Sequence, residues 1–509
     1  MALDSRNSTG DGPPMTALPT MVEEALRHAP EAKAIEFDGR WYHWMEIAQL
    51  AQAVRQSVRI AGGGVDAPVA LVARNHPAVI SALLGLLAEG RSVQMIYAFQ
   101  SSAALARDIE RLEPCIVIAM AQDIGTEVRD VLASHDVAAI ALEEMSAAVL
   151  PGFEQTARVV QGPEHPCVEI LTSGTTGPPK RFPISFDMIS RHMMGNVGMA
   201  GAARKGEENP VPFLLFFPIG NISGIYSTIP TLLRGQPAVL LERFSLPAWR
   251  EFILRYRPAA SGLPPTAFQM LLDADIPRED LASIKVMATG AAPLDPGVQR
   301  AFEEKYGIPV LLSYGATEFG GPVATMNLEL LQRFGTSKLG SVGQAMPGAK
   351  LRVVDSASGA PLPAGAEGLL EVVSPRIGAD WIRTSDIAVI DADGFLFIRG
   401  RSDGAILRGG FKLVPDVIER ALMQHPAIGA AAVVGVDDRR LGQVPGAVIQ
   451  CAAGATLTAH EAEVHLRALL PATHIPVYWC FVEELPKNPS MKIDRPAVAG
   501  LFIDAGAVS

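Results

Sequence analysis

The sequence predicts an α/β fold. We expect a large N-terminal domain of mixed, mostly parallel sheets packed with helices, which includes a small β subdomain, and a small α+β C-terminal domain. Through the first 310 residues, short apolar runs alternate with segments of helical periodicity, as is typical of βαβ units. Closely spaced strand patterns with an Asp-Gly turn then indicate an antiparallel subdomain between 350 and 398. From 415 to 482, helix and strand patterns alternate again.

Composition fits a well-packed globular protein of more than one domain. The chain has 509 residues, of which 49% are hydrophobic and 19% charged, so each domain can bury its own core. The net charge of −11 argues against a nucleic-acid partner, although it allows a local positive pocket for one nucleotide. Four cysteines without C-x-x-C spacing predict neither a disulfide framework nor a zinc site, which is typical of a reducing compartment.

The N-terminal segment 1–19 is rich in Ser, Gly and Pro and is predicted to be disordered. It lacks the basic and then apolar pattern of a secretory signal. The longest apolar run, 78–88, is too short for a transmembrane segment. We therefore expect a cytoplasmic protein, and its oligomeric state stays open, with a homodimer as one candidate.

Periodicity places the individual elements. Before the first motif it predicts helices at 21–29, 44–60 and 76–88, a hairpin at 34–41, and strands at 69–72, 115–119 and 137–142. After the motif it predicts a helix at 186–199 and strands at 212–217, 350–354, 368–373, 387–390 and 395–398. In the C-terminal domain it predicts helices at 415–425 and 459–470 and strands at 430–436, 446–451 and 478–482.

A polar loop between two strand patterns carries the motif around which the chain is organised. Residues 171–180 have the sequence Leu-Thr-Ser-Gly-Thr-Thr-Gly-Pro-Pro-Lys. Glycines let the backbone approach an anion, and hydroxyls and a lysine donate to it. The spacing differs from that of the Walker loop, and the alternative is an exposed loop with an incidental lysine. The predicted phosphate-binding residues are Thr172, Ser173, Gly174, Thr175, Thr176, Gly177 and Lys180.

Two further stretches predict a nucleotide site at the carboxyl ends of strands, where open α/β sheets bind ligands. The small residues Gly290, Ala291 and Ala292 follow an apolar run and permit close approach of an adenine ring, although they also suit any tight turn. The second stretch is Ser313-Tyr314-Gly315-Ala316-Thr317-Glu318. Its tyrosine can stack on adenine, its threonine can bind the α-phosphate, and its glutamate can hold Mg²⁺. In the alternative interpretation the tyrosine lies in the core and the glutamate is solvated.

Together these stretches resemble the acyl-adenylate-forming superfamily, whose members include AMP-forming acyl-CoA and aryl-CoA synthetases, adenylation domains and luciferases. The resemblance covers about residues 20–500. It implies a large ATP- and acyl-binding domain at 20–402 and a mobile lid domain at 403–509. Five stretches occur in family order, namely the phosphate loop, Tyr314 to Glu318, Asp386, Arg401 to Asp403, and Lys492.

The resemblance also implies roles for individual residues. Lys492, Glu318 and Thr317 are the implied catalytic residues, and Glu318 and Thr175 the metal-binding ones. Asp386 is implied to bind the ribose hydroxyls, Arg401 a ribose or phosphate group, and Asp403 is the implied hinge. The implied CoA tunnel is formed by Arg408, Gly409 and Gly410, and the implied acyl pocket by Asn221, Gly315 and Gly320. The chain departs from the family pattern at Arg181, Asn221, Ser385 and Met491.

The implied activity is that of a carboxylic acid–CoA ligase that uses ATP, Mg²⁺ and CoA. Carboxylate attack on the α-phosphorus of ATP gives an acyl-adenylate, which CoA then takes up, and such chemistry depends mainly on positioning and charge stabilisation. The loops 216–224 and 316–321 contain no charge apart from Glu318, which favours a fatty or aryl acid. One alternative is a stand-alone enzyme that loads an acyl carrier protein. Another is an inactive nucleotide- or acyl-binding sensor, against which the presence of Lys492 argues.

Overall fold

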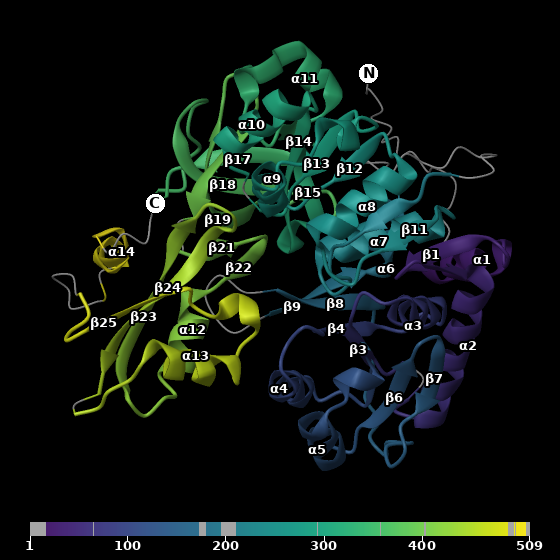
Figure 1. Cartoon of the computed structure of the whole chain (residues 1–509). Helices are drawn as coiled ribbons and strands as arrows, with labels where there is room; N and C mark the ends of the chain where they lie inside the picture. The colour runs from purple at the N-terminus through teal and green to yellow at the C-terminus, as the bar shows by residue number, and fades with distance from the viewer. Residues whose placement is uncertain are drawn as a thin grey trace, which may run out of the picture.

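The computed structural model places three sheets and their helices in the N-terminal region, an antiparallel sheet after them, and a separate C-terminal group of elements (Figure 1). It describes residues 17–64, 66–172, 180–194, 210–292, 294–356, 358–401, 404–452, 454–486, 493 and 495–504. The predicted fold class is confirmed.

The first sheet has seven strands in the order β7-β6-β5-β3-β4-β8-β9, with parallel pairing inside and antiparallel pairing at both edges. Apolar residues of α2 and α3 cover one face, and those of α4 and α5 cover the other. Its strands are β3 (Val69–Ala73), β4 (Val93–Tyr97), β5 (Ile116–Met120), β6 (Ala138–Glu143), β7 (Ser146–Val149), β8 (Cys167–Thr172) and β9 (Lys180–Ser185). Its helices are α1 (Leu18–His28), α2 (Trp44–Ala61), α3 (Pro77–Ala88), α4 (Ser102–Leu112), η1 (Ala121–Asp123) and α5 (Thr126–Ser134).

Two smaller sheets continue the N-terminal region, in the orders β10-β11-β1-β2 and β12-β13-β14-β15-β16. The predicted hairpin forms, because Gly39 at φ +79° closes its turn. Their strands are β1 (Lys33–Phe37), β2 (Arg40–His43), β10 (Phe213–Leu215), β11 (Ala238–Leu240), β12 (Ala260–Gly262), β13 (Val286–Thr289), β14 (Val310–Ala316), β15 (Gly321–Thr325) and β16 (Gln344–Ala345). The intervening helices are α6 (Phe186–Met188), η2 (Ile189–Met193), α7 (Ile222–Leu233), α8 (Leu246–Tyr256), α9 (Pro265–Asp273), η3 (Arg278–Leu281), α10 (Pro296–Tyr306), η4 (Thr317–Phe319), α11 (Leu328–Phe334) and η5 (Gly335–Lys338).

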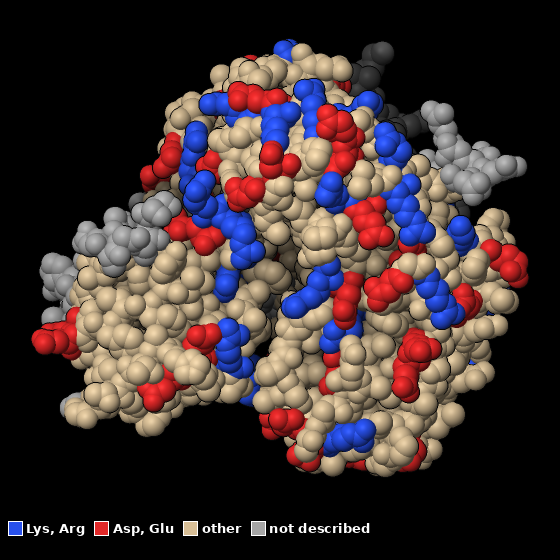
Figure 2. Space-filling model, viewed as in Figure 1, with Lys and Arg blue, Asp and Glu red and all other residues tan. Residues whose placement is uncertain are grey.

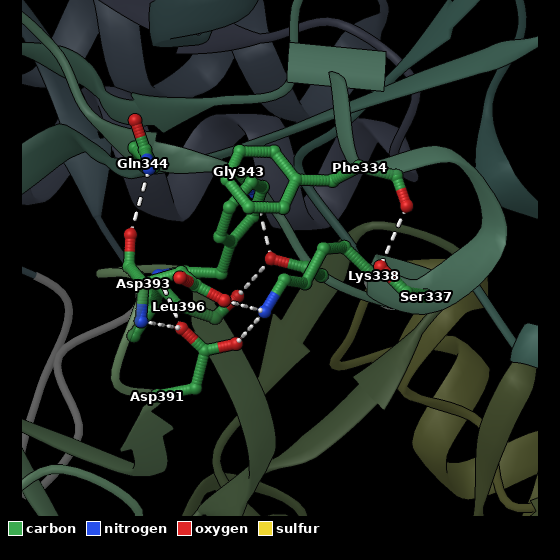
Figure 3. A network of polar contacts seen from close by, with 10 residues as sticks. Phe334, Ser337, Lys338, Gly343, Gln344, Asp391, Asp393 and Leu396 are labelled. Atoms are coloured by element: carbon green, nitrogen blue, oxygen red, sulfur yellow. Dashed lines mark hydrogen bonds and ion pairs between the residues drawn. The ribbon is translucent and has the colours of Figure 1, made fainter. Parts of the chain in front are cut away.

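The predicted antiparallel subdomain is the sheet β17-β18-β19-β20. Lys338, at the end of η5, binds the turn between the last two strands of this sheet. The Lys338 Nζ lies 2.7 Å from Asp391 Oδ2 and 2.6 Å from Asp393 Oδ2 (Figure 3). These two carboxylates raise the pKa of Lys338. Its strands are β17 (Lys350–Val354), β18 (Glu367–Val373), β19 (Ile382–Ile390) and β20 (Leu396–Arg401).

The C-terminal elements form their own sheet, in which β24 pairs with β21, β23 and β25, and two apolar clusters pack on it. The boundary predicted between 402 and 403 falls on residues outside the described part and stays a prediction. These elements are β21 (Ile406–Arg408), β22 (Phe411–Leu413), α12 (Pro415–Leu422), β23 (Ile428–Asp438), β24 (Gly442–Cys451), α13 (Ala459–Arg467), η6 (Ala472–His474), β25 (Tyr478–Val482) and α14 (Arg495–Asp504).

Three local predictions differ from the structure. Helix α1 begins at Leu18, inside the segment expected to be disordered, because Pro19 suits a first helical turn and Leu18 is buried. In the described part of the helix expected over 186–199, one short α turn is followed by a π-helical segment, Ile189–Met193, and residues 195–199 lie outside the described residues. The central strand β4 was not predicted. No helix in the part of the chain that the structure describes has the length and apolar character needed to cross a bilayer.

Candidate active site

Tyr314 and Asp386, which the sequence placed in separate motifs, meet in the structure. Tyr314 lies near the end of β14, and its hydroxyl donates to Asp386 Oδ2 at 2.5 Å. Asp386 lies inside β19 and is only 9% exposed. Arg401 is its register partner on β20, so the predicted Arg401 position is directly opposite Asp386. Three predicted nucleotide-binding positions are therefore gathered at one place from two sheets.

The small residues after β13 lie beside this strand end. A Cβ on Gly290 would be 2.4 Å from Ser313 Oγ, so a larger residue there requires the Ser313 side chain on the neighbouring strand β14 to move. Ala291 has φ +67°, a left-handed conformation that alanine seldom adopts. Such strained residues cluster at functional sites, which supports the predicted role of Gly290, Ala291 and Ala292 as a ligand-facing turn. A Cβ on Gly315 would likewise be 2.5 Å from Gly321 O, so β14 and β15 approach closely there.

Thr317 and Glu318 form the short 3₁₀ turn η4 that follows β14. Both side chains are half-buried, and no hydrogen bond or ion pair engages either of them in the described residues. An unpaired carboxylate beside a predicted phosphate site fits Mg²⁺, which is usually held by one or two carboxylates together with substrate phosphates. No group of three or more metal-binding side chains occurs in the described ranges, so the protein groups there do not form a cage.

The predicted acyl-pocket residues lie on neighbouring segments but use their side chains differently. Asn221 caps α7, since its Oδ1 accepts a hydrogen bond from the Gly224 amide at 2.9 Å. A Cβ on Gly320 would be 2.9 Å from Met188 Sδ, so the turn after η4 packs against α6.

Sequence analysis missed two basic side chains near this turn, because they belong to distant segments. Arg376 contacts the turn through its guanidinium, and burial lowers its pKa. Burial, together with the positive charge of Arg376, also lowers the pKa of His192 on η2. Arg376 thus places a positive charge near the expected acyl pocket that its two loops do not indicate, whereas the lowered pKa of His192 favours its neutral form.

The predicted CoA-tunnel loop lies against the predicted nucleotide site. Gly409 and Gly410 adopt φ +54° and +90° at the turn between β21 and β22. A Cβ on Gly409 would be 3.5 Å from Thr266 Cγ2, and one on Gly410 would be 4.0 Å from Ala292 Cβ. The loop therefore reaches from the C-terminal elements to the strand ends of the N-terminal region.

Arg408 differs from the other two residues of this loop, because its guanidinium is engaged inside the C-terminal elements. Its Nη1 donates to Thr473 O at 2.5 Å and to Ile475 O at 3.1 Å. Burial lowers its pKa, and Asp438 opposes that shift. The side chain braces the segment after α13, and its predicted contact with CoA is not visible in these bonds.

A cavity of about 360 Å³ opens behind this loop, where the C-terminal elements meet the first sheet (Figure 2 shows the surface hollowed there, with basic residues on both sides). Phe99 at its wall is flanked by two guanidinium groups, that of Arg74 at 4.7 Å and that of Arg243 at 4.3 Å from the ring centroid. The Phe411 ring, next to Gly410, lies 6.4 Å from the Tyr97 ring, which links the loop to the cavity wall. The lining residues are Arg74, Ala98, Phe99, Gln100, Ser101, Asp123, Arg243, Arg467, Leu470 and Ala472.

The three arginines of the cavity differ in how far their charge is neutralised. Arg74 is held by Asp123 at 2.5 Å and Glu242 at 2.7 Å. Arg467 pairs with Glu463 on its own helix at 2.6 Å. Arg243 forms no ion pair within the described ranges, so it supplies the uncompensated positive charge.

Several predicted residues lie outside what the structure describes. These are the phosphate-loop residues Ser173, Gly174, Thr175, Thr176 and Gly177, the hinge Asp403, and Lys492, together with the side chains of Thr172, Lys180 and Arg401. Arg181, a departure from the family pattern, follows Lys180 on β9. Burial lowers its pKa, and its Nη1 is buried without a hydrogen-bond partner among the described residues.

Comparison with known proteins identifies the family of the chain. The model of the AMP-binding enzyme family matches residues 22–378, and that of the AMP-binding enzyme C-terminal domain matches 417–492. A sulfoacetate–CoA ligase from Cupriavidus necator is 28% identical and covers 88% of this chain and 90% of its own. A 2-succinylbenzoate–CoA ligase from Geobacillus kaustophilus is 26% identical, with 94% and 97% covered. Among solved structures, the amide bond synthetase McbA from Marinactinospora thermotolerans superposes with a TM-score of 0.81 at 26% identity, over 95% of this chain and 99% of McbA.

Proposed function

Because the chain belongs to the AMP-binding enzyme family, the superfamily of AMP-forming acyl-CoA synthetases that its motifs predicted, we propose that it activates a fatty or aryl carboxylic acid with MgATP and transfers the acyl group to CoA. The proposed reaction has two steps. The acid carboxylate attacks the α-phosphorus and releases pyrophosphate, and the CoA thiolate then attacks the acyl-adenylate and releases AMP.

For the first step, the gathered nucleotide positions support a division of roles. Tyr314 and Asp386 hold the adenosine, with Asp386 accepting from the ribose hydroxyls. Thr317 donates to the α-phosphate, and Glu318 would hold Mg²⁺, which neutralises phosphate charge. We assign Lys492 to the charge that develops between the carboxylate and the α-phosphate, and a donor placed there contributes on the order of 10²–10³ in rate.

The acceptor is the second part of the proposal, and the contact of Gly409 and Gly410 with Thr266 and Ala292 carries it. In this arrangement the glycines of the loop would face the proposed adenylate. Glycines at positive φ leave room for a thin, unbranched arm, because any Cβ there would approach Thr266 and Leu441.

The cavity behind the loop supplies complementary chemistry for the charged end of CoA. A pantetheine arm passing Phe411 and Tyr97 would deliver the phosphates beside Arg243 and Arg467. Guanidinium groups suit phosphate oxygens because their planar fork donates two hydrogen bonds. Among these arginines, Arg243 is the one we expect to bind a phosphate, because no carboxylate neutralises it in the part of the chain described.

A different acceptor is the main alternative. McbA, similar over nearly the whole chain, is an amide bond synthetase, so an amine acceptor belongs in the test. An acyl carrier protein would present the same pantetheine arm without the nucleotide. Neither acceptor has a use for the arginine-lined cavity. An inactive sensor is the remaining alternative, and it predicts ATP binding without acid-dependent pyrophosphate release.

We also propose that the C-terminal elements turn about Asp403 between the two steps, so that Lys492 and the Gly409–Gly410 loop act in succession. In the present arrangement Arg107 on α4 bonds the C-terminal elements directly, since its guanidinium donates to Leu469 O at 2.6 Å and to Ala468 O. These carbonyls end α13, where donors are otherwise lacking. Location in the cytoplasm and assembly as a homodimer stay proposals on the sequence evidence above.

Pyrophosphate release from MgATP, measured across a panel of acids with and without CoA, tests the function. The panel holds fatty and aryl acids, and it includes sulfoacetate and 2-succinylbenzoate because those acids are named for the relatives. Turnover that requires both acid and CoA establishes the ligase. If pyrophosphate release is indifferent to CoA but is stimulated by amines or by a carrier protein, then that compound, and not CoA, is the acceptor.

A further inference from the structure

The turn that follows Glu318 has a backbone path that favours glycine. Gly320 adopts φ +67° and Gly321 φ +118°, both in the region that favours glycine. Two glycines in succession maximise the conformational freedom lost on folding. Because η4 ends at Phe319, any looseness in this turn passes directly to Thr317 and Glu318.

Arg376 supports this turn from the loop after β18. Its Nε donates to Phe319 O at 3.3 Å, and its Nη2 donates to Pro322 O. The two carbonyls lie on either side of the glycine pair, so one guanidinium bonds the chain both before and after it. Ser374, two residues earlier, adds a hydrogen bond from its Oγ to the same Phe319 O at 2.6 Å.

Packing encloses the turn on its other sides. A Cβ on Gly320 would be 2.9 Å from Met188 Sδ and 3.2 Å from Arg376 Cβ. A Cβ on Gly321 would be 2.9 Å from the Tyr226 ring. The turn is therefore seated between α6, α7 and the Arg376 side chain. The pairing of β14 with β15 joins its two flanks, and the guanidinium bonds a carbonyl at each end.

An ordinary stabilising ion pair does not account for Arg376. No carboxylate pairs with it among the described residues, and burial lowers its pKa. A half-buried charge without a counter-charge is costly. The planar guanidinium of Arg376 reaches two carbonyls three residues apart, and the single ammonium group of a lysine cannot reproduce both bonds fully.

We propose that Arg376 is a positioning residue for adenylation, which rests on the function proposed above. By fixing Phe319 and Pro322 it holds η4 in the orientation that directs Thr317 and Glu318 at the phosphates and Mg²⁺. It does not touch the reacting atoms. Its loss should therefore impair use of MgATP and leave the later thiol step unaffected.

The test compares Arg376→Met and Arg376→Lys with Arg158→Met. Arg158 is a matched control, because its guanidinium also donates only to backbone carbonyls, at 3.1–3.2 Å from Glu113 O, Pro114 O and His135 O, far along the chain from η4. Hydrogen exchange of the peptide 313–325, without any substrate, reports on the turn itself. ATP–pyrophosphate exchange titrated with Mg²⁺ reports on adenylation, and thioester formation from a supplied acyl-adenylate reports on the second step.

We expect Arg376→Met to raise exchange in 313–325, to lower the adenylation rate by about 10- to 100-fold, and to raise the Mg²⁺ concentration at half-saturation. Arg376→Lys should restore part of the rate, and Arg158→Met should change none of these three readings. Unchanged exchange in 313–325 for Arg376→Met overturns the proposal, as does a rate loss equal in the two steps. If wild type shows no acid-dependent activity, the proposed function fails. Hydrogen exchange of 313–325 still tests whether Arg376 holds the turn.

Discussion

Arg243→Gln should raise the Michaelis constant for CoA and leave adenylation unchanged. Arg243 carries the uncompensated charge of the cavity, whereas Arg74 faces Asp123 at 2.5 Å and Glu242 at 2.7 Å. A hydrogen bond to a charged group is worth about 1.5–3 kcal/mol, and exposure of Arg243 to solvent reduces this through screening. We expect about 1–2 kcal/mol, which corresponds to a 5- to 30-fold rise.

The assay is CoA-dependent pyrophosphate release, with ATP–pyrophosphate exchange measured alongside. Arg300→Gln is the matched control, because it makes the same charge change at an exposed position on α10, away from the cavity. Pantetheine, which lacks the nucleotide, separates charge recognition from passage through the tunnel, so wild type and Arg243→Gln should use it equally well. Equal Michaelis constants for CoA in wild type and variant would refute the assignment of the cavity to CoA phosphates.

Three further predictions follow from the site. Tyr314→Phe removes a 2.5 Å hydrogen bond to a buried carboxylate. Such a bond is worth about 1.5–3 kcal/mol, so the variant should raise the Michaelis constant for ATP about 10- to 100-fold. An unchanged constant contradicts the nucleotide assignment. Gly290→Ala places a Cβ 2.4 Å from a serine Oγ. It should lower the melting temperature and adenylation, while Gly500→Ala, with nothing within 4 Å of its Cβ, should stabilise α14 by about 0.5–1 kcal/mol. Arg107→Ala removes the hydrogen bonds to Ala468 O and Leu469 O. It should slow thioester formation from supplied acyl-adenylate by about 3- to 10-fold. Equal slowing of adenylation would show that these hydrogen bonds do not favour one step.

Local patterns were enough to predict many of the strands and several of the helices. The apolar runs at β3 and β25 predict strands, and both strands form where expected. The strand β4 was missed because a five-residue run that includes Gln94 is too short for periodicity to separate strand from loop. Its identity comes from pairing with β3 and β8, which only the tertiary structure supplies.

The helix expected after the phosphate loop shows the opposite limit. Residues from 186 onward have helical periodicity, yet the chain winds as a π-helix from Ile189 to Met193. Widened helical turns of this kind are frequent at functional sites, and periodicity cannot distinguish them from an α-helix. This segment carries His192, one of the two basic residues that sequence analysis did not connect with the acyl pocket.

Arg408 and Arg243 show why the site could be predicted only in part. The family pattern assigned Arg408 to the tunnel by its place beside Gly409, and that place is retained. The guanidinium nevertheless turns inward and donates to the carbonyls of Thr473, in η6, and of Ile475, which follows it. The positive charge at the cavity is instead contributed by residues such as Arg243, more than 160 positions away in the chain. Motifs specify backbone geometry at the passage, whereas the charges that would select the acceptor depend on which distant segments the fold brings beside it. For this reason the Arg243 experiment tests the identity of the acceptor more directly than any substitution within the motifs.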